Sequence, residues 1–430
     1  MDTIYAPATA PGRAGVGILR VSGPQVTEII DYFCSFPVSE RVATLRKLTD
    51  GPGGDFIDEA LILRFSAGAS FTGEDVVEFQ HHGSLAVSQR LQQILAMRPG
   101  VRLAERGEFT RRAVENGRLD LIQAEGLLDL IEADTEMQRR QALEVFGGGL
   151  SSLAKEWREQ LLRAIALVEA TIDFSEEEIP SGLEDQVSAI LTSLIAAIDK
   201  QLAGASAAQR VREGFEVAIV GRPNVGKSTL LNALGRREIA LTSDIAGTTR
   251  DVIEVPLQIE GQLVNILDTA GLRSAEDRVE QMGVDLARRR ANAADLRIFL
   301  LAPGQDHIDE NAGVMVHQDD IVLQGQDDDG SRGGVSGRTG AGLDSLLNEI
   351  GLRAAQCQRE ASFVIRDRQR IKLETGLKAL HAAQSGLGEI DIELVAEDLR
   401  HCSVALDGLI GYIGPESILG EIFSSFCIGK

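Results

Sequence analysis

The chain has 430 residues, a length typical of two or three domains. Its formal net charge of −22 at pH 7 argues against an open basic surface for nucleic acid, so RNA binding would depend on a confined patch or a partner protein. Four cysteines without metal-ligand spacing suit a reducing cytosol, and we find neither a signal peptide nor an apolar stretch long enough to cross a bilayer. We therefore predict a cytoplasmic protein that binds neither DNA nor a membrane.

Residues 1–118 alternate short apolar runs, such as Ile18–Val21 and Ala60–Phe65, with glycine turns. One segment near Leu85–Ala96 has the periodicity of a helix. Short strands mixed with a helix are typical of a compact α+β domain. The first predicted domain therefore covers residues 1–118.

After Leu119, apolar residues recur at three- and four-residue steps, which places them on one face of long helices. Two early stripes are Leu153, Trp157, Leu161, Ile165, Val168 and Ile172, and Val187, Ile190, Leu191, Leu194, Ile195 and Ile198. The later stripes are Ile371, Leu377 and Leu380, and Leu394, Leu399, Leu406, Leu409 and Ile413. Stripes of this kind indicate core packing rather than a cofactor site.

Because each helical half has an apolar face to cover, we predict that residues 119–213 and 356–430 pack together as one helical domain. Residues 214–355 would then form an α/β nucleotide domain inserted between them. A linear order of three independent domains is the alternative.

The segment Gly221–Ser228, Gly-Arg-Pro-Asn-Val-Gly-Lys-Ser, fits the phosphate-loop (P-loop) pattern G-x-x-x-x-G-K-S. An apolar strand precedes it and a helix follows, as this loop requires. Backbone N–H groups of such a loop surround phosphate oxygens, Lys227 places its charge on the outer phosphates, and the Ser228 hydroxyl ligates Mg²⁺. The predicted nucleotide contacts are Asn224, Val225, Gly226, Lys227, Ser228 and Thr229.

Two further segments lie at the distances that a GTPase uses. Asp268 follows an apolar run, so its carboxylate emerges at a strand end, where it holds Mg²⁺ through water. A polar stretch before it can close over the nucleotide and offer Thr249 as a second Mg²⁺ ligand. The predicted contacts in these segments are Ser243, Asp244, Ile245, Ala246, Gly247, Thr248, Thr249, Asp268, Thr269, Ala270 and Gly271. Together with the P-loop, they predict a switch GTPase rather than a kinase or a motor ATPase.

Leu272 stands where many small GTPases carry the glutamine that orients the attacking water. Another group must therefore position that water. Asn224 can offer its side-chain oxygen to a monovalent cation beside the phosphates, where other GTPases use an arginine finger. Its alternative role is to stabilise the turn.

Six stretches of the sequence together resemble the MnmE family of tRNA-modification GTPases, also called TrmE. The stretches are Pro11–Gly23, Phe71–Phe79, Gly221–Ser228, Asp244–Asp251, Asp268–Arg273 and Phe426–Lys430. The resemblance covers nearly the whole chain. It implies three parts: an amino-terminal α+β domain, a helical domain and an inserted Ras-like P-loop GTPase domain.

The resemblance implies a potassium-stimulated enzyme that hydrolyses GTP to GDP and phosphate and forms a homodimer across the bound cation. It assigns K⁺ to Asn224, Ser243, Ile245 and Thr248, Mg²⁺ to Ser228 and Thr249, and catalytic roles to Lys227 and Glu280. The implied task is folate-dependent modification of the wobble uridine, position 34, of certain tRNAs. The implied partner is a flavin-containing MnmG-type protein, in a heterotetramer.

The resemblance also implies that residues 1–118 dimerise and bind a tetrahydrofolate derivative, 5-formyl- or methylene-tetrahydrofolate. The matching positions are Arg20, Glu78, Arg118 and Lys430. A carboxylate such as Glu78 suits the donor edge of a pterin, and the cations suit the glutamate tail. Arg118 stands where the family usually has lysine. Without the resemblance, Arg20 and Glu78 would be interpreted as surface charges.

Cys427 is the predicted reactive group outside the nucleotide site. A cysteine on a short terminal tail is exposed and forms thiolate where a base or cation lies close, and the resemblance implies a role for it in tRNA modification. A disordered tail is the alternative. The other cysteines, Cys34, Cys357 and Cys402, are predicted to be small apolar fillers.

The largest departure from the family lies in the segment that recognises guanine. The chain reads Gln324-Gly325-Gln326-Asp327 where the family is expected to carry Asn-Lys-x-Asp. In this alignment Asp327 accepts hydrogen bonds from guanine, Gln324 imitates the asparagine, and Gly325 cannot replace the lysine that packs on the base. Ser336 opens a loop that matches the usual Ser-Ala-Lys only in part. We therefore predict weaker guanine selectivity than is usual in the family.

Two other functions remain open from the sequence. A ribosome-assembly GTPase would bind structured RNA without modifying it. A nucleotide-binding scaffold with a degenerate guanine pocket would bind nucleotide without hydrolysing it.

Overall fold

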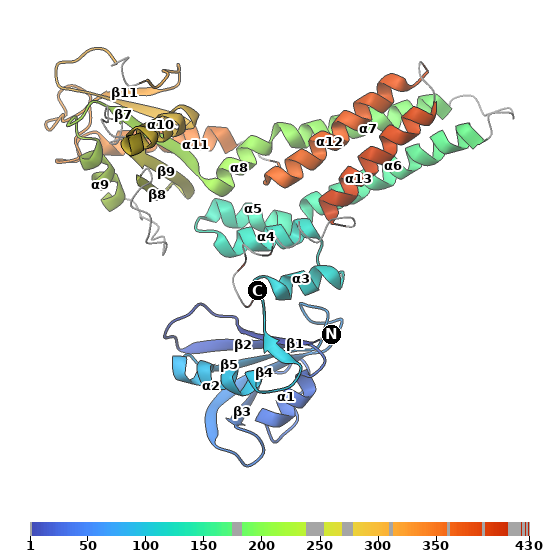
Figure 1. Cartoon of the computed structure of the whole chain (residues 1–430). Coiled ribbons are helices and arrows are strands. Elements are labelled where there is room, and N and C mark those ends of the chain that lie inside the picture. The colour runs from blue at the N-terminus through green and yellow to red at the C-terminus, as the bar shows by residue number, and fades with distance from the viewer. Residues whose placement is uncertain are drawn as a thin grey trace. The chain divides into compact units, whose positions relative to one another are not determined.

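The computed structural model describes residues 2–173, 183–237, 253–268, 278–308, 313–358, 362–388 and 392–411, together with 423, 426 and 429. The described chain forms two compact units (Figure 1). Unit 1 consists of residues 1–128 and 406–430, and unit 2 of residues 129–405. The division predicted from the sequence, with boundaries at 118, 213 and 355, remains a prediction.

Unit 1 is built on a six-stranded sheet in the order β3-β4-β5-β2-β1-β6, in which only β1 and β6 pair in parallel. Its strands are β1 Thr3–Pro7, β2 Val16–Ser22, β3 Thr44–Thr49, β4 Phe56–Phe65, β5 Val76–His82 and β6 Val101–Leu103. Its helices are α1 Val26–Phe33, α2 Leu85–Ala96, α3 Glu108–Glu115 and most of α4 Leu121–Glu132. This is the α+β fold that the sequence predicts, and the predicted helix near Leu85–Ala96 is confirmed.

Helices cover both faces of this sheet. α1 and α2 share one core, in which Phe33 of α1 meets Phe79 of β5 edge-on, with ring centroids 5.5 Å apart. On the other face, Phe109 of α3 packs with Ile4 of β1. Buried apolar contacts on both faces hold the strands rigidly, so side chains on β2 and β5 have fixed positions.

Unit 1 also contains a network of buried charges around α3. The guanidinium of Arg112 contacts Asp2 at 2.7 Å, Glu108 at 3.0 Å and Glu74 at 3.1 Å. Arg102 contacts the same Glu108 carboxylate at 2.6 Å. Burial opposes ionisation of Glu108, but hydrogen bonds from the two arginines and from a backbone N–H outweigh it and lower the pKa of this carboxyl.

Unit 2 combines long helices with a second sheet. The helices are α5 Glu136–Phe146, α6 Gly149–Asp173, α7 Leu183–Ala203, α8 Ala205–Glu213, α9 Lys227–Arg237, α10 Arg278–Ala293, α11 Leu343–Gln358, α12 Asp367–Gly386 and α13 Ile392–Ile410, which runs into unit 1. α7 packs against α6 and α12 (Figure 1). Trp157, Leu161 and Val168 of the predicted stripes are buried. Ile371 and Leu394 are instead 52% and 58% exposed, because each helix buries only one side.

The second sheet has the order β11-β10-β7-β9-β8, and all its pairs are parallel except β8 with β9. Its strands are β7 Phe215–Gly221, β8 Ile253–Ile259, β9 Gln262–Asp268, β10 Leu296–Leu301 and β11 Ile321–Gln324. Val217 and Ile219 of β7 face a core shared with α9 and α11, while Ala218 and Val220 face α10. The carboxyl ends of β7, β9 and β11 therefore lie at the same edge of a sheet that is covered on both faces, which is where ligands bind in such folds.

One buried carboxylate joins the segments that flank this sheet. Asp129 accepts Nε of Arg212 at 2.9 Å and Nη2 of Arg366 at 2.6 Å. Arg212 lies at the end of α8, just before β7, and Arg366 caps the start of α12. The amide of Gln138 also donates to the backbone oxygen of Arg212 at 2.9 Å. The two ends of the nucleotide-binding segment are thus fixed to one residue of α4.

The sequence suggested no membrane-spanning stretch, but one described helical stretch reaches the necessary length and apolarity. Leu183–Glu213 has 31 residues and a mean hydropathy of 1.3 in its most apolar window. A core helix of a soluble protein passes the same test, so this is weak support for a membrane span. Val187, Leu191 and Ile198 of this stretch are buried within the protein.

Candidate functional site

The P-loop connects β7 to α9 in the conformation that phosphate binding requires. Asn224 and Gly226 have left-handed backbones, with φ of 65° and 99°, which turn successive N–H groups toward one side. Nζ of Lys227 donates to the backbone oxygens of Gly221 at 2.7 Å and Arg222 at 2.9 Å. Its charge is thus held within the loop, where phosphate oxygens can replace the two carbonyl acceptors.

Glycine is required at the start of this loop. A Cβ on Gly221 would lie 2.6 Å from the backbone oxygen of Leu300 in the neighbouring strand β10. The loop therefore passes close to the sheet edge, and Ser228 falls in the first turn of α9. That position is the positive end of the helix dipole, where an anion is stabilised.

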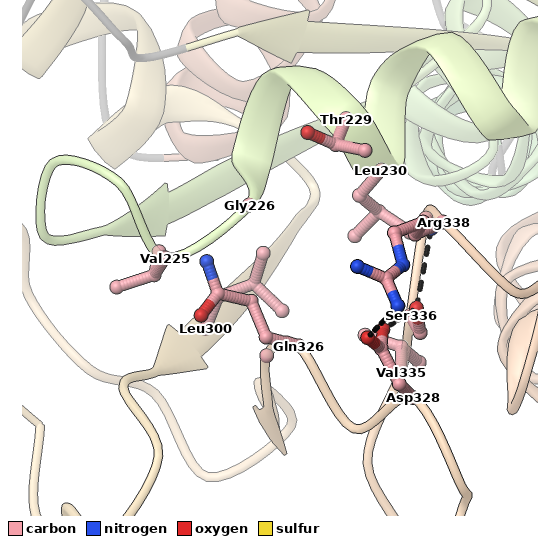
Figure 2. A pocket seen from close by; sticks show the side chains of 12 residues that line it. Val225, Gly226, Thr229, Leu230, Leu300, Gln326, Asp328, Val335, Ser336 and Arg338 are labelled. Atoms are coloured by element: carbon pink, nitrogen blue, oxygen red, sulfur yellow. Dashed lines mark hydrogen bonds and ion pairs between the residues drawn. The ribbon is translucent and has the colours of Figure 1, made fainter.

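Beside the P-loop lies a cavity of about 390 Å³. Its lining includes Thr229, Gln326, Asp328, Ser336 and Arg338 (Figure 2). The Oγ of Ser336 donates to Oδ1 of Asp328 at 2.6 Å, and Nη2 of Arg338 lies 3.2 Å from Oδ2 of the same carboxylate. The backbone N–H groups of Arg338 and Thr339 donate to Ser336 at 3.1 Å, so this hydroxyl is held in place as it holds Asp328.

Asp327, the carboxylate predicted to read the base, is not among the residues that line the cavity. It is 1% exposed, and its Oδ2 accepts the N–H groups of Arg332 at 3.0 Å and Gly334 at 2.9 Å. Oδ1 of Asp327 is buried without a hydrogen-bond partner among the described residues, so one acceptor of this carboxylate remains open, whereas Asp328, one residue on, lines the cavity. The amide of Gln324 donates to the backbone oxygen of Gln305 at 2.7 Å, outside the cavity lining.

Several predicted residues belong only partly to the described structure. Asp268 ends β9 and pairs with Ile219, which places its backbone beside the start of the P-loop. Glu280 lies in the first turn of α10, but the side chains of Asp268 and Glu280 lie outside the description. The predicted residues outside the described chain are Ser243, Asp244, Ile245, Ala246, Gly247, Thr248, Thr249, Thr269, Ala270, Gly271, Cys427 and Lys430.

In unit 1 the structure brings together two of the predicted folate contacts. Arg20 of β2 faces Glu78 of β5 across the strands, with Nη2 and Oε1 2.9 Å apart. The Arg20 guanidinium also lies 5.7 Å from the ring centroid of Phe109, and its Nη1 donates to the backbone oxygen of Gly429 at 3.4 Å. Arg118 lies in the exposed turn after α3.

The described residues near the carboxyl end belong to unit 1 and pack against its other residues. Phe423 and Phe426 are buried with Leu128 of α4. Gly429 has a φ of 102°, and a Cβ there would lie 2.0 Å from the backbone oxygen of Pro7, so only glycine fits. These contacts bring the chain end to the strands that carry Arg20 and Glu78.

The other described cysteines match the prediction of apolar fillers. Cys34 and Cys402 are buried, and burial raises the pKa of the two thiols to about 11 and about 12. Thiols with such values do not react readily at neutral pH. The side chain of Cys357 lies outside the described residues.

Comparison with known proteins decides the family. Residues 3–118 match the family described as GTP-binding protein TrmE N-terminus, and residues 121–427 match the MnmE helical domain. The chain belongs to the MnmE (TrmE) family. It is 50% identical to the tRNA modification GTPase MnmE of Cereibacter sphaeroides and 47% identical to that of Ruegeria pomeroyi, with both chains of each pair covered completely.

Among solved structures, Era of Aquifex aeolicus aligns at 27% identity over 32% of this chain and 56% of that chain, with a TM-score of 0.26. A TM-score this low supports no structural argument about this chain. Family membership makes this chain a GTP hydrolase that acts in tRNA modification, and it confirms the predicted combination of an amino-terminal TrmE domain, helices and a P-loop domain.

Proposed function

We propose that this MnmE chain is a potassium-stimulated GTPase that modifies the wobble uridine, position 34, of certain tRNAs with a folate-derived carbon. The observation that supports it most directly is the P-loop and the cavity beside it. The loop contains left-handed Asn224 and buried Lys227, and Asp328 is among the residues that line the cavity. A phosphate-binding loop and a base pocket side by side form a nucleotide site.

In this site Lys227 neutralises the outer phosphates, and the loop N–H groups hold them in line for attack. Ser228, Thr249 and Asp268 are the residues that would hold Mg²⁺, which would add positive charge beside the phosphates. Glu280 is the proposed residue that orients water. The Oδ oxygens of Asp328 receive the guanine N–H groups, and Ser336 keeps the carboxylate in place.

Potassium fits the chemistry of Asn224. Its amide oxygen is a neutral donor on an exposed left-handed residue next to the phosphate-binding backbone. Ser243, Ile245 and Thr248 are proposed to complete the site. A bound K⁺ adds positive charge beside the phosphates without a second protein's arginine.

The proposed folate site joins Arg20 and Glu78 to Arg118 and Lys430. Glu78 is 16% exposed and retains acceptor capacity beyond its bond with Arg20, which suits the N–H edge of a pterin. The exposed Arg118 can reach an anionic tail. A folate derivative would supply a one-carbon unit, and Cys427 is proposed to serve the modification step.

The proposal includes a homodimer, a flavin-containing MnmG-type partner in a heterotetramer, and a cytoplasmic location. The net charge of −22 favours a partner that supplies part of the attraction for tRNA. Gln324 and Gly325, which replace the asparagine and the lysine of Asn-Lys-x-Asp, favour the rival scaffold, which would bind nucleotide but not hydrolyse it.

GTP turnover in KCl and in NaCl tests this proposal. We expect strong stimulation by K⁺ in the native chain and its loss in Asn224→Ala. Asn232→Ala, an exposed asparagine in α9, is the matched control and should keep the stimulation. Turnover in neither salt would support the scaffold, and unchanged stimulation in Asn224→Ala would refute the cation assignment.

A further inference from the structure

The segment that departs from the family makes direct contact with the P-loop. Nε2 of Gln326 donates to the backbone oxygen of Asn224 at 2.6 Å. The stem of the same side chain lies against Gly226, since a Cβ on Gly226 would be in ordinary contact, at 3.5 Å, with Cγ of Gln326. Figure 2 shows Gln326 extending toward the P-loop, away from Asp328 and Arg338.

The missing side chain at position 325 makes this approach possible. A Cβ on Gly325 would lie 2.5 Å from the backbone oxygen of Val225. Any larger residue would push the two loops apart, because the atom that it meets belongs to the backbone. The base-side loop therefore lies directly on the P-loop here, with Gly325 against Val225 and Gln326 bonded to Asn224.

Both ends of the Gln326 hydrogen bond are residues in an uncommon conformation. Asn224 and Gln326 have φ of 65° and 57°, and they are two of four described non-glycine residues with positive φ. Such a conformation costs free energy and persists only where the surroundings hold it. The hydrogen bond joins the two strained peptides and supplies part of that constraint.

We infer that Gln326 is a positioning residue that holds the Asn224 peptide and thereby fixes the Asn224 side chain as a cation ligand. The inference rests on the potassium site proposed above. It joins the base-side loop to the cation site through one side chain, so a change at Gln326 alters activation by K⁺ although Gln326 is not itself a cation ligand.

The test compares full-length Gln326→Ala with Gln324→Ala. Both variants remove a glutamine amide that donates to a backbone oxygen, but the acceptor of Gln324 is Gln305, outside the P-loop. Loss of one such bond is worth about a threefold to tenfold change in an equilibrium. We expect Gln326→Ala to raise the half-saturating K⁺ concentration by that factor, and Gln324→Ala to change it less than twofold.

Two further measurements separate positioning from general damage. Gln326→Met keeps a flexible stem of similar length without the amide donor and should raise the half-saturating K⁺ concentration as Gln326→Ala does. Hydrogen exchange of residues 221–228 should be faster in Gln326→Ala and native-like in Gln324→Ala. Equal effects of the two alanine variants, or no effect of Gln326→Ala on either readout, would overturn the inference.

The exchange measurement also distinguishes the two proposals. If the native enzyme shows no stimulation by K⁺, the proposed cation chemistry fails. Faster exchange of the P-loop in Gln326→Ala would then still show that Gln326 holds it. If K⁺ stimulates the native enzyme and Gln326→Ala leaves both readouts unchanged, only the role of Gln326 is refuted.

Discussion

Exchanging one carboxylate for an amide identifies the residue that reads the base. Asp328 faces the cavity beside the P-loop, whereas Asp327 is buried and bonded to backbone N–H groups of its own loop. Guanine presents two donors, N1–H and the 2-amino group, which pair with a carboxylate. Xanthine has a carbonyl in place of the amino group, so it pairs with the oxygen and the N–H₂ of an asparagine. Asp328→Asn should therefore bind xanthosine nucleotides in preference to guanosine nucleotides.

The size of the effect follows from the hydrogen bonds that change. A hydrogen bond to a charged acceptor is worth about 1.5–3 kcal/mol. Two such bonds amount to about 3–6 kcal/mol, or a loss of roughly 10²- to 10⁴-fold in affinity for GDP. Ser336 already donates to Oδ1 of Asp328, and Arg338 lies on the outer side, so the carboxylate is oriented before the base arrives. The change from carboxylate to amide keeps the shape of the site.

Titration calorimetry with GDP and XDP provides the assay, and Asp327→Asn is the adjacent control. We expect Asp328→Asn to lose affinity for GDP and gain affinity for XDP, while Asp327→Asn keeps its GDP affinity within about threefold, roughly 0.7 kcal/mol. The opposite pattern, with the switch in Asp327→Asn, would restore the assignment made from sequence and refute the one made from structure. ADP measured in parallel tests the predicted weakness of guanine selectivity in the native chain.

Three further predictions concern stability, measured as the free energy of unfolding in urea. Gly325→Ala forces a Cβ to within 2.5 Å of a backbone oxygen and should cost about 1–3 kcal/mol, whereas Gly15→Ala, with nothing within 4 Å, should cost little. The pKa of Glu108 is lower in the folded state than the ordinary value of 4.5, so the unfolded chain binds more protons in acid. The resulting stability is present above about pH 4.5 and is lost as the pH falls through the lowered pKa. Glu108→Gln should show a smaller loss of stability as the pH falls below about 4.5. Asp129→Ala removes an acceptor of Arg366 and one of the two carboxylate acceptors of Arg212, which keeps Glu213, and should cost about 2–3 kcal/mol; equal stability of Asp129→Ala and the exposed Asp134→Ala would contradict this.

The sequence predicted those parts of the fold that depend on local pattern. Gly221–Ser228 is recognisable because the loop needs particular residue types at fixed spacing, and its strand and helix follow from periodicity. The same holds for the helix at Leu85–Ala96. Exposure of Ile371 was not predictable, since the pattern shows which residues share a face but not which faces find a partner.

The base-side loop shows why the remaining contacts needed a structure. The chain carries three successive aspartates, Asp327 to Asp329. The sequence alone therefore does not show which of two neighbouring aspartates faces the base. Contacts five to eight residues along the chain distinguish the two side chains: the hydroxyl of Ser336 bonds to Asp328, and the N–H groups of Arg332 and Gly334 bond to Asp327. A signal was present in the sequence, because Ser336 belongs to the other motif of a guanine pocket, but only the fold shows which carboxylate it meets.

The structure also gives a physical reason for glycine at position 325, where the family is expected to carry lysine. From the sequence alone, Gly325 only removes a contact, because glycine has no side chain that could pack on the base. In the fold, its missing Cβ lets the backbone oxygen of Val225 approach, and that approach brings the amide of Gln326 within 2.6 Å of the Asn224 oxygen. A lysine at 325 would have to separate the two loops and break this bond. Gly325 and Gln326 therefore act as a pair, and restoring lysine at position 325 alone should weaken the P-loop rather than repair the site.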